Sequence, residues 1–422
     1  MDEPTFNLSL FDLVMSLSTA ADLVSPTVAN HQRRVACIAL SLAEELGFSP
    51  PELSAVALAG SLHDIGIFTL RERISTLDFE ITNPGRHAEL GYLFLRRFDP
   101  LSLVAEIVRY HHHSWQHGEG SHVDGRPVPA SSFLVGLADR LDTLINPATN
   151  VLSQAPAILR RIGERSGELF VPQHVEALRH VARRDTFWLD IVSPMIDRVI
   201  QQKIQPHQVV QTLDELTGLA QLFSRIIDFK SAYTSTHSAG VAACAATVAR
   251  LVGFSLHDCT LMRIAGYLHD IGKLAIPGEL LDKSGELTDE EYSLVRSHAY
   301  YTRRVLDGVA GLGRITDWAA SHHERLDGQG YPSNRLAGDL SLSTRIVAAA
   351  DVFTALAEDR PYRPGLAKTQ AVAALQQMGG GGQLDPTLVE LLVVYFDEVN
   401  DARQAAQQAA AEDYMALMQS LA

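Results

Sequence analysis

The chain has 422 residues, enough for two domains of about 200 residues each. Hydrophobic residues make up 46% of it, and its formal net charge of −15 argues against a nucleic-acid or anionic-membrane surface, because such partners need a basic face. Three scattered cysteines exclude a disulfide framework, and no run approaches the roughly 18 apolar residues of a membrane span, so we expect a cytoplasmic protein.

Helical periodicity runs through nearly the whole chain, and alternating strand patterns are almost absent. Residues 35–46 place apolar side chains on one stripe, and residues 241–252 repeat the pattern; a glycine follows each segment. Between them, residues 196–227 have the pattern of a helix that breaks near Pro206. The sequence therefore predicts an all-α protein.

The two halves of the chain resemble each other. His-Asp-Ile-Gly occurs at 63–66 and again at 269–272, and Gly-Glu-Leu-Phe-Val-Pro at 167–172 resembles Gly-Gln-Leu-Asp-Pro at 382–386. We predict tandem helical domains in this order: an N-terminal domain of residues 1–195, a helical connector of 196–221, a second domain of 222–400 and a C-terminal helix of 401–422. The last helix either lies on the surface or packs on a partner subunit in a homodimer.

Histidines and aspartates recur at matching intervals in the two halves. His63 follows His31 by 32 residues, and His269 follows His237 by 32 residues. The first set comprises His31, His63, Asp64, His87, His111, His112 and Asp139. The second set comprises His237, His269, Asp270, His298, His322, His323 and Asp351. Each set is drawn from five separate segments, which predicts that each converges in space.

Such a set suits a pair of metal ions. A lone helical histidine is usually a core or surface residue, so the repeated intervals carry the argument. His269 and Asp270 point about 100° apart if both are helical, so they share a site only when the carboxylate bridges two ions. Histidine with carboxylate and without thiolate favours Fe, Mn or similar ions over structural zinc. Two such ions form a clamp for phosphoryl displacement.

The second half resembles the HD-GYP family of the HD phosphohydrolase superfamily. The stretches that carry the resemblance are YTSTHSAGVA (233–242), LHDIGKLAIP (268–277), LTDEEYSLVRSH (287–298), SHHERLDGQGYP (321–332) and RIVAAADVFTAL with RPYR (345–363). The resemblance implies an all-α fold and a phosphodiesterase of bacterial signalling. Its substrate would be a cyclic dinucleotide, with cyclic di-GMP the first candidate, and its product the linear dinucleotide or the mononucleotide.

The resemblance also implies roles for individual residues. The second set would hold two divalent ions, Fe or Mn first and Ni, Co, Mg or Zn also compatible, with Asp270 as the bridge. Lys273 would stabilise charge on the scissile phosphate. The implied substrate contacts are Arg325, Gly330, Tyr331, Pro332, Arg345, Arg360 and Arg363. Some of these arginines could instead pair only with nearby acids, Arg325 and Arg345 foremost.

Two positions depart from the family pattern. Tyr233 stands where part of the family has a glutamate that binds a third metal, so we predict a two-metal site. Thr354 stands where the family often has a second aspartate, three residues after Asp351. We expect this second difference to bear on substrate preference rather than to abolish catalysis.

The first half keeps a full ligand set but departs elsewhere. Ile67 replaces the lysine of the second half, His113 follows the paired histidines in place of glutamate, and no Gly-Tyr-Pro follows. Phe133 stands where the second half has Arg345. Three readings stay open: a second hydrolytic site, a regulatory site for metal or nucleotide, and a structural or dimerising relic.

Two alternatives to cyclic di-GMP hydrolysis also remain. A degraded HD repeat before an HD-GYP repeat is similar to bacterial enzymes that hydrolyse 3'3'-cGAMP. A non-catalytic protein of the same fold could instead bind a dinucleotide and pass the signal to a partner.

Overall fold

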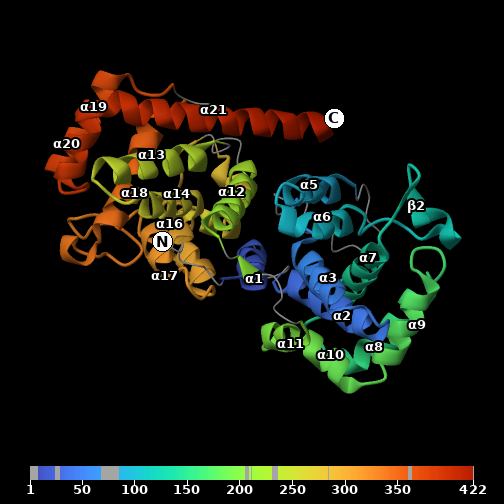
Figure 1. The fold of residues 1–422 in the computed structure, drawn as a ribbon. Helices are drawn as coiled ribbons and strands as arrows, with labels where there is room; N and C mark the ends of the chain where they lie inside the picture. The colour runs from blue at the N-terminus through green and yellow to red at the C-terminus, as the bar shows by residue number, and fades with distance from the viewer. Residues whose placement is uncertain are drawn as a thin grey trace. The chain divides into compact units, whose positions relative to one another are not determined.

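The computed structural model describes residues 8–23, 29–67, 85–204, 209–210, 212–230, 236–283, 285–359 and 364–421. Within these ranges the protein is helical, and its strands are two residues long (Figure 1). The strands are β1 (Leu8–Ser9), β2 (His122–Val123), β3 (Arg126–Pro127) and β4 (Val209–Val210). The prediction of an all-α protein is confirmed.

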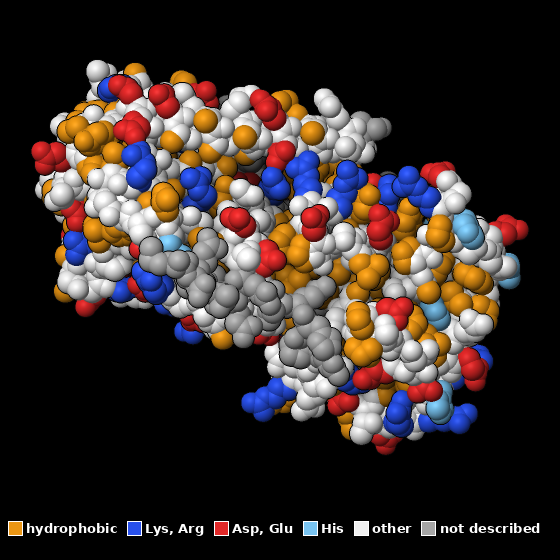
Figure 2. All heavy atoms as spheres, in the orientation of Figure 1, with side chains coloured by type: hydrophobic (Ala, Val, Ile, Leu, Met, Phe, Trp, Pro, Cys, Tyr) orange, Lys and Arg blue, Asp and Glu red, His pale blue; other side chains and the backbone are white. Residues whose placement is uncertain are grey.

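The chain forms two compact units, and each is described by itself. The N-terminal unit comprises residues 25–209, and the C-terminal unit comprises residues 210–420 together with residues 1–24. On the face drawn in Figure 2, acidic side chains lie among the basic ones on both units. None of the described helices is long and apolar enough to cross a membrane.

The N-terminal unit is built around one central helix. Its α-helices are α2 (His31–Glu45), α3 (Pro50–Leu62), α5 (Gly85–Leu95), α6 (Ser102–Arg109), α7 (Ala130–Thr143), α8 (Val151–Gly163), α9 (Pro172–Val181), α10 (Asp185–Ile191) and α11 (Ile196–Lys203). Helix α2 packs against α3 and α7, and α6 packs against α3 and α5. Strands β2 and β3 form an antiparallel pair after the short 3-10 helix η3 (Gln116–Ser121).

The C-terminal unit repeats this arrangement. Its α-helices are α1 (Leu10–Asp22), α12 (Leu213–Phe229), α13 (His237–Leu251), α14 (Leu256–Leu268), α15 (Gly278–Leu281), α16 (Asp289–Asp307), α17 (Gly313–Ala320), α18 (Leu342–Ala357), α19 (Lys368–Gly380), α20 (Pro386–Val394) and α21 (Phe396–Leu421). Helix α13 packs against α14 and α18, as α2 packs against α3 and α7. The 3-10 helix η4 (Ile271–Ala275) follows α14 and packs against α16.

Local sequence explains where the central helices begin and end. Gly47 (φ +76°) follows α2 and Gly253 (φ +89°) follows α13, so each glycine adopts the left-handed backbone that other residues avoid. The side chain of Ser255 caps α14 by accepting from the backbone N–H of Asp258. The predicted helices at 35–46 and 241–252 thus overlap α2 and α13, which begin four residues earlier and end one residue earlier than expected.

A glycine at each central crossing brings two helices together. A Cβ atom on Gly60 of α3 would lie 2.6 Å from the Cα of Ala36 of α2. A Cβ atom on Gly266 of α14 would lie 2.5 Å from the Cα of Ala242 of α13. Only a residue without a side chain fits at these distances. Each glycine lies three residues before the histidine of the repeated His-Asp-Ile-Gly motif, so the crossing also fixes where that motif begins.

Two boundaries differ from those the sequence suggested. Helix α1 falls in the predicted N-terminal domain, yet it packs on η4 and α16 in the C-terminal unit. Helix α12 overlaps the predicted connector, yet it packs on α13, α14 and η4. Both helices are amphipathic, and a pattern of apolar residues does not say which neighbour will cover them. Pro206, where the connector was expected to break, lies outside the described residues.

Candidate metal centres

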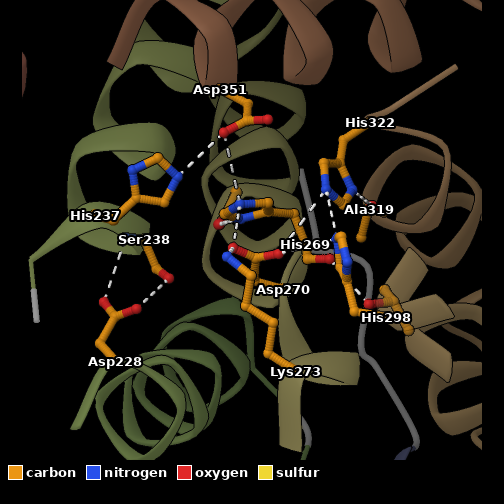
Figure 3. Close-up of polar contacts among 12 residues, drawn as sticks. Asp228, His237, Ser238, His269, Asp270, Lys273, His298, Ala319, His322 and Asp351 are labelled. Atoms are coloured by element: carbon orange, nitrogen blue, oxygen red, sulfur yellow. Dashed lines mark hydrogen bonds and ion pairs between the residues drawn. The ribbon is translucent and has the colours of Figure 1, made fainter. Parts of the chain in front are cut away.

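Five segments bring the second histidine–aspartate set together, as predicted (Figure 3). His237 is the first residue of α13, His269 and Asp270 directly follow α14, and His298 lies in α16. The pair His322 and His323 follows α17, and Asp351 lies in α18. Their side chains are buried, except that of His323, which is 30% exposed.

Asp270 stands between two groups of histidines. Its Oδ2 lies 3.1 Å from His269 Nε2. Its Oδ1 lies 3.3 Å from His298 Nε2 and 3.9 Å from His322 Nε2. One carboxylate oxygen thus faces each group, which is the geometry that a bridging ligand between two cations requires.

Asp351 connects the remaining ligands. Its Oδ1 lies 3.1 Å from His237 Nε2, and its Oδ2 lies 3.9 Å from His323 Nδ1. Two sets of three side chains in this unit could each hold a cation. Within each set, the possible ligand atoms lie within 4.8 Å of one another. The two sets are His237 with His269 and Asp270, and His298 with His322 and His323.

Backbone carbonyls orient three of the imidazoles. The Nδ1–H groups of His269, His298 and His322 donate to the carbonyl three residues earlier, at 2.7, 2.6 and 2.7 Å respectively. These bonds hold the proton on Nδ1 and leave the Nε2 lone pair facing the other ligands. All three rings therefore have the tautomer and the direction that a metal ligand needs.

The charge states also suit a cation. Burial raises the pKa of Asp270, but His269 and Lys273 outweigh it and hold this pKa well below its usual range. Burial and the neighbouring His298 lower the pKa of His323 to about 3. Although burial lowers the pKa of His237, the carboxylates of Glu358 and Asp351 raise it to about 10, so binding a cation there would release a proton.

Lys273 adds a positive charge beside the bridge. Its Nζ donates to Asp270 Oδ2 at 2.5 Å, and its side chain is 18% exposed. Burial lowers the pKa of Lys273, but the carboxylate of Asp270 outweighs this effect and holds the pKa above its usual value. The ammonium group therefore stays charged and can approach an anionic ligand.

The predicted Gly-Tyr-Pro loop covers one of the ligands. The Tyr331 ring lies against the His323 ring with 4.6 Å between centroids, and Arg296 lies 4.7 Å from the centroid of Tyr331. A Cβ atom on Gly330 would lie 2.4 Å from the backbone nitrogen of Arg325, so the loop needs glycine at this position. Pro332 follows Tyr331 directly. The loop thus brings an aromatic face and a guanidinium to the edge of the site.

The arginines expected to contact substrate fare differently. Arg345 donates to Asp385 at 2.8 Å and to two backbone carbonyls, so its guanidinium holds a loop in place. Arg325 pairs with Asp327 at 2.5 Å. Substrate contacts by these two residues stay predictions, and the described bonds give both a structural role. Arg360 and Arg363 lie outside the described residues, as does Tyr233.

Three neighbours of the site were missed by sequence reasoning. Glu358 lies 3.1 Å from His237 Nδ1, and Arg296 lies over Tyr331. Asp228 accepts from the hydroxyl of Ser238 at 2.7 Å, and burial raises the pKa of this carboxyl to about 7. None of the three belongs to a repeated interval. The position of Arg296, two residues before a predicted ligand, was the one available signal.

The first set converges in the same way inside the N-terminal unit. Asp64 Oδ1 lies 3.4 Å from His87 Nε2. Asp64 Oδ2 lies 3.6 Å from His63 Nε2 and 3.7 Å from His31 Nε2. Burial raises the pKa of Asp64, but these histidines lower it to about 2. Asp64 therefore lies between histidines in its unit as Asp270 does in the other.

The remaining ligands complete the N-terminal set. Asp139 lies 3.3 Å from His31 Nε2, and Arg140 pairs with Asp139 at 2.5 Å. The Nδ1–H of His111 donates to the carbonyl three residues earlier at 2.6 Å. Among the described residues, the Nε2 atoms of His63 and His111 are buried without a hydrogen bond, as are both oxygens of Asp64. Buried polar atoms of this kind normally have partners, so the cluster fits a cation.

Comparisons with known proteins agree with this duplicated design. Two family models described as "HD domain" match residues 28–144 and 221–388. The chain is 30% identical over 397 residues to 3'3'-cGAMP-specific phosphodiesterase 1 of Vibrio cholerae. The match covers 92% of this chain and 92% of the relative. The chain is 29% identical over 423 residues to phosphodiesterase 3 of that name and organism, which covers 88% of this chain and 91% of the relative.

A cyclic di-GMP phosphodiesterase of Pseudomonas aeruginosa is 32% identical over 210 residues, 48% of this chain and 50% of the relative. Among solved structures, a V. cholerae phosphodiesterase described as specific for cyclic GMP-AMP superposes with a TM-score of 0.62 at 23% identity. It covers 96% of this chain and 98% of its own, which supports the fold. The chain therefore belongs to the HD-GYP family of the HD phosphohydrolase superfamily, as the sequence motifs predicted.

Proposed function

We propose that this protein is a metal-dependent phosphodiesterase that hydrolyses a cyclic dinucleotide in its C-terminal unit, with 3'3'-cGAMP as the substrate. The position of Asp270 carries the proposal, because its two oxygens face different groups of histidines. Lys273 places a charged ammonium beside this carboxylate. Water would add to phosphorus as one ester P–O bond breaks, which opens the ring to the linear dinucleotide.

Each part of the site has a task in this reaction. Two divalent cations, when bound to the second set, lower the pKa of a water and neutralise charge on the phosphate oxygens. The chain fixes where they bind, because its imidazoles are held in one tautomer by the backbone. Lys273 stabilises the charge that develops on phosphate oxygen, and Tyr331 presents a flat apolar face on which a base can stack. Fe or Mn fits the mixed histidine and carboxylate ligands.

The length of the match favours 3'3'-cGAMP. The two relatives that match across both units carry the name 3'3'-cGAMP-specific phosphodiesterase. Cyclic di-GMP, the first candidate from the motifs, is the second candidate function, supported by relatives that match 40% to 48% of this chain. A non-catalytic receptor is the weakest candidate, since a receptor has no need of Lys273 beside a complete ligand set.

We propose further that the N-terminal unit binds divalent metal without hydrolysing the dinucleotide. Its ligand set is complete and buried, which supports metal binding. Ile67, which is 6% exposed, stands in place of Lys273, so the unit lacks the ammonium that the reaction uses. These two observations together support a structural or regulatory centre.

The test is hydrolysis by the full chain loaded with Mn²⁺ or Fe²⁺. Each dinucleotide is incubated separately at equal concentration, and products are resolved by chromatography. We expect 3'3'-cGAMP to be opened with the higher kcat/KM, no turnover by His269→Ala, and turnover retained by the matched variant His63→Ala. Failure of the wild type to cleave either dinucleotide would refute the activity, and faster cleavage of cyclic di-GMP would reverse the substrate assignment.

A further inference from the structure

A chain of hydrogen bonds connects the first metal ligand of the C-terminal unit to its last helix. Glu358 holds both carboxylate oxygens 3.1 Å from His237 Nδ1. The amide of Gln407, on α21, donates through Nε2 to Glu358 Oε2 at 3.0 Å. Glu358 is 5% exposed, so this contact lies inside the unit. The imidazole of His237 is thus supported by a helix that begins 45 residues after Asp351, at Phe396.

The direction of the Gln407 amide is also fixed. Arg403, one turn earlier on α21, donates from Nη1 to Gln407 Oε1. Since that oxygen accepts from a guanidinium, the amide nitrogen must face Glu358. Arg403 is itself 5% exposed and donates to Asn400 Oδ1 at 2.8 Å. Arg403 and Gln407, on neighbouring turns of α21, therefore together hold the carboxylate of Glu358.

A glycine lets α21 come this close. A Cβ atom on Gly240 of α13 would lie 3.0 Å from Gln407 Nε2 and 2.9 Å from Thr354 Cγ2. Any side chain at this position would push Gln407 or Thr354 away. Farther along, Tyr414 of α21 packs on Phe229 of α12, with 5.1 Å between ring centroids. The last helix therefore contacts the C-terminal unit at several turns between Phe396 and Tyr414 rather than at one point.

In the N-terminal unit a different residue supports the first histidine. There His31 Nδ1 contacts Asp142 Oδ2 at 2.7 Å, and Arg34 donates to Asp142 at 2.6 Å. Asp142 lies three residues after the ligand Asp139. Three residues after Asp351, the C-terminal unit has Thr354, a buried hydroxyl that cannot supply a negative charge.

We propose that Glu358 replaces the carboxylate missing at position 354, and that α21 holds Glu358 in place through Gln407. Glu358 and Gln407 are positioning residues: they act on the metals through His237. A carboxylate on Nδ1 fixes the imidazole tautomer and makes Nε2 a better ligand, so its loss typically weakens metal binding 10- to 100-fold. The role in catalysis rests on the proposed function, whereas the effect on metal affinity does not.

The test measures Mn²⁺ affinity by isothermal titration calorimetry. All variants are made in a full-length chain whose N-terminal centre is removed by His63→Ala, so that titration reports the C-terminal centre. We expect Glu358→Ala to weaken the tighter Mn²⁺ site about 10- to 100-fold and Gln407→Ala to weaken it to a smaller degree. The matched control is Gln408→Ala, since Gln408 lies on the same helix and donates to the exposed Glu412. The Mn²⁺ affinity of this control should equal that of the parent.

A transfer of the carboxylate separates positioning from simple damage to the fold. The double variant Glu358→Ala/Thr354→Asp restores the arrangement of the N-terminal unit and should recover most of the lost affinity. In that background Gln407→Ala should have no further effect, because Gln407 no longer has a carboxylate to hold. Thermal melts without metal, followed by circular dichroism, confirm that each variant is folded. If Glu358→Ala is not folded, the near-isosteric Glu358→Gln replaces it.

Unchanged Mn²⁺ affinity in both Glu358→Ala and Gln407→Ala would overturn the inference. So would equal weakening by Gln407→Ala and Gln408→Ala, because α21 would then act through general stability alone. Hydrolysis is measured in a separate assay on the wild type. If the wild type binds Mn²⁺ but cleaves no dinucleotide, the proposed function fails while the positioning role of Glu358 is still decided by the titrations.

Discussion

At the scale of single residues, the second partner of each imidazole determines what the imidazole can bind. A backbone carbonyl accepts a hydrogen bond from the Nδ1–H of His269, at 2.7 Å, and another accepts from that of its counterpart His63, at 2.8 Å. His237 and His31 begin their helices, so no carbonyl of a preceding turn is available to them. Carboxylates fill that need, Glu358 in one unit and Asp142 in the other. The histidine is repeated in both units, but the carboxylate that contacts its Nδ1 comes from a different position in each.

Removing the ammonium beside the bridge should separate catalysis from metal binding. We expect Lys273→Ala to lower kcat by about 10²- to 10³-fold, because the variant loses stabilisation of charge on the phosphate. The metal content should stay that of the wild type, since Lys273 is not a ligand. Steady-state kinetics and elemental analysis of the same preparation measure both quantities. A variant that lost its metal together with its activity would show that Lys273 acts by ordering Asp270 instead.

A buried histidine outside both metal sets predicts a pH effect on stability. His174 of α9 is 5% exposed, and burial lowers its pKa from 6.5 to about 4. Between these two values the unfolded chain takes up a proton that the folded chain does not, so the free energy of unfolding falls as pH falls. The slope is about 1.4 kcal/mol per pH unit, for a total of roughly 3 kcal/mol.

Urea unfolding at pH 6.5, 5.5 and 4.5 measures this slope for the wild type and for His174→Leu. The variant should lose stability less steeply than the wild type over this range. His122→Gln, at an exposed position of the same unit, is the control and should follow the wild type. Parallel curves for the wild type and His174→Leu would contradict the assignment.

The sequence predicted which histidines and aspartates come together, but few of the groups that support them. Ligands recur at fixed intervals, because each must reach the same point from an equivalent helix. Glu358 and Gln407 could not be found this way, since their counterpart Asp142 occupies a different position on a different turn. For Arg345 the sequence left a substrate contact and pairing with a nearby acid open, and the structure pairs its guanidinium with Asp385.

At the scale of elements, the glycine of His-Asp-Ile-Gly has a packing role. A Cβ atom on Gly272 would lie 2.0 Å from the carbonyl oxygen of His298, in α16. A Cβ atom on Gly66 would lie 2.2 Å from the carbonyl oxygen of His87, in α5. The motif thus contains both the ligands and the gap that lets the next ligand-bearing helix approach them. Its repetition in the two units has a steric reason as well as a chemical one.

Substituting this glycine should therefore move a ligand without removing one. We expect Gly272→Ala to push α16 away, lower stability by about 1–3 kcal/mol and weaken metal binding at the C-terminal centre. Gly285→Ala is the matched control, because a Cβ atom there would meet nothing within 4 Å. Thermal unfolding and Mn²⁺ titration of the three proteins test this. Equal behaviour of the two variants would mean that the contact with His298 is easily relieved.

Local signals mark where several helices begin. Helix α16 begins at a capping box of Thr288 and Glu291, and α20 begins with Pro386. Helix α1 was placed in the other domain, because its partners η4 and α16 are distant in sequence, and the first part of α12 was counted in the connector. Helix α21 was expected to start at 401 as a surface or subunit-contacting helix. It starts at Phe396, and within the C-terminal unit it packs on α12 and α13.

At the scale of the whole molecule, one architecture is used twice with different surroundings. Both units place an aspartate between histidines from equivalent helices. The C-terminal unit adds Lys273 and the Tyr331 loop, and the N-terminal unit has Ile67 and a β2–β3 pair in its place. The sequence predicted the duplication because metal ligands tolerate little change in spacing. It could not assign a function to the N-terminal centre, because that function depends on which ligands the surrounding residues allow to bind.

The duplicated centres predict how metal removal affects the folded protein. Each unit buries carboxylates that have no hydrogen bond on at least one oxygen, as at Asp64 and Asp270. A cation that binds only the folded state stabilises it by about 2.7 kcal/mol when its free concentration is 100 times the Kd. Chelation should therefore lower the unfolding temperature, and Mn²⁺ should restore it.

Single-site variants show whether each unit contributes. His63→Ala and His269→Ala should each bind fewer ions per chain than the wild type, and Mn²⁺ should stabilise each by calorimetry through its intact unit alone. The double variant should show no response to Mn²⁺. If His63→Ala bound as many ions as the wild type, the N-terminal set would be no metal centre, and its buried histidines and aspartates would have to stabilise one another without a cation.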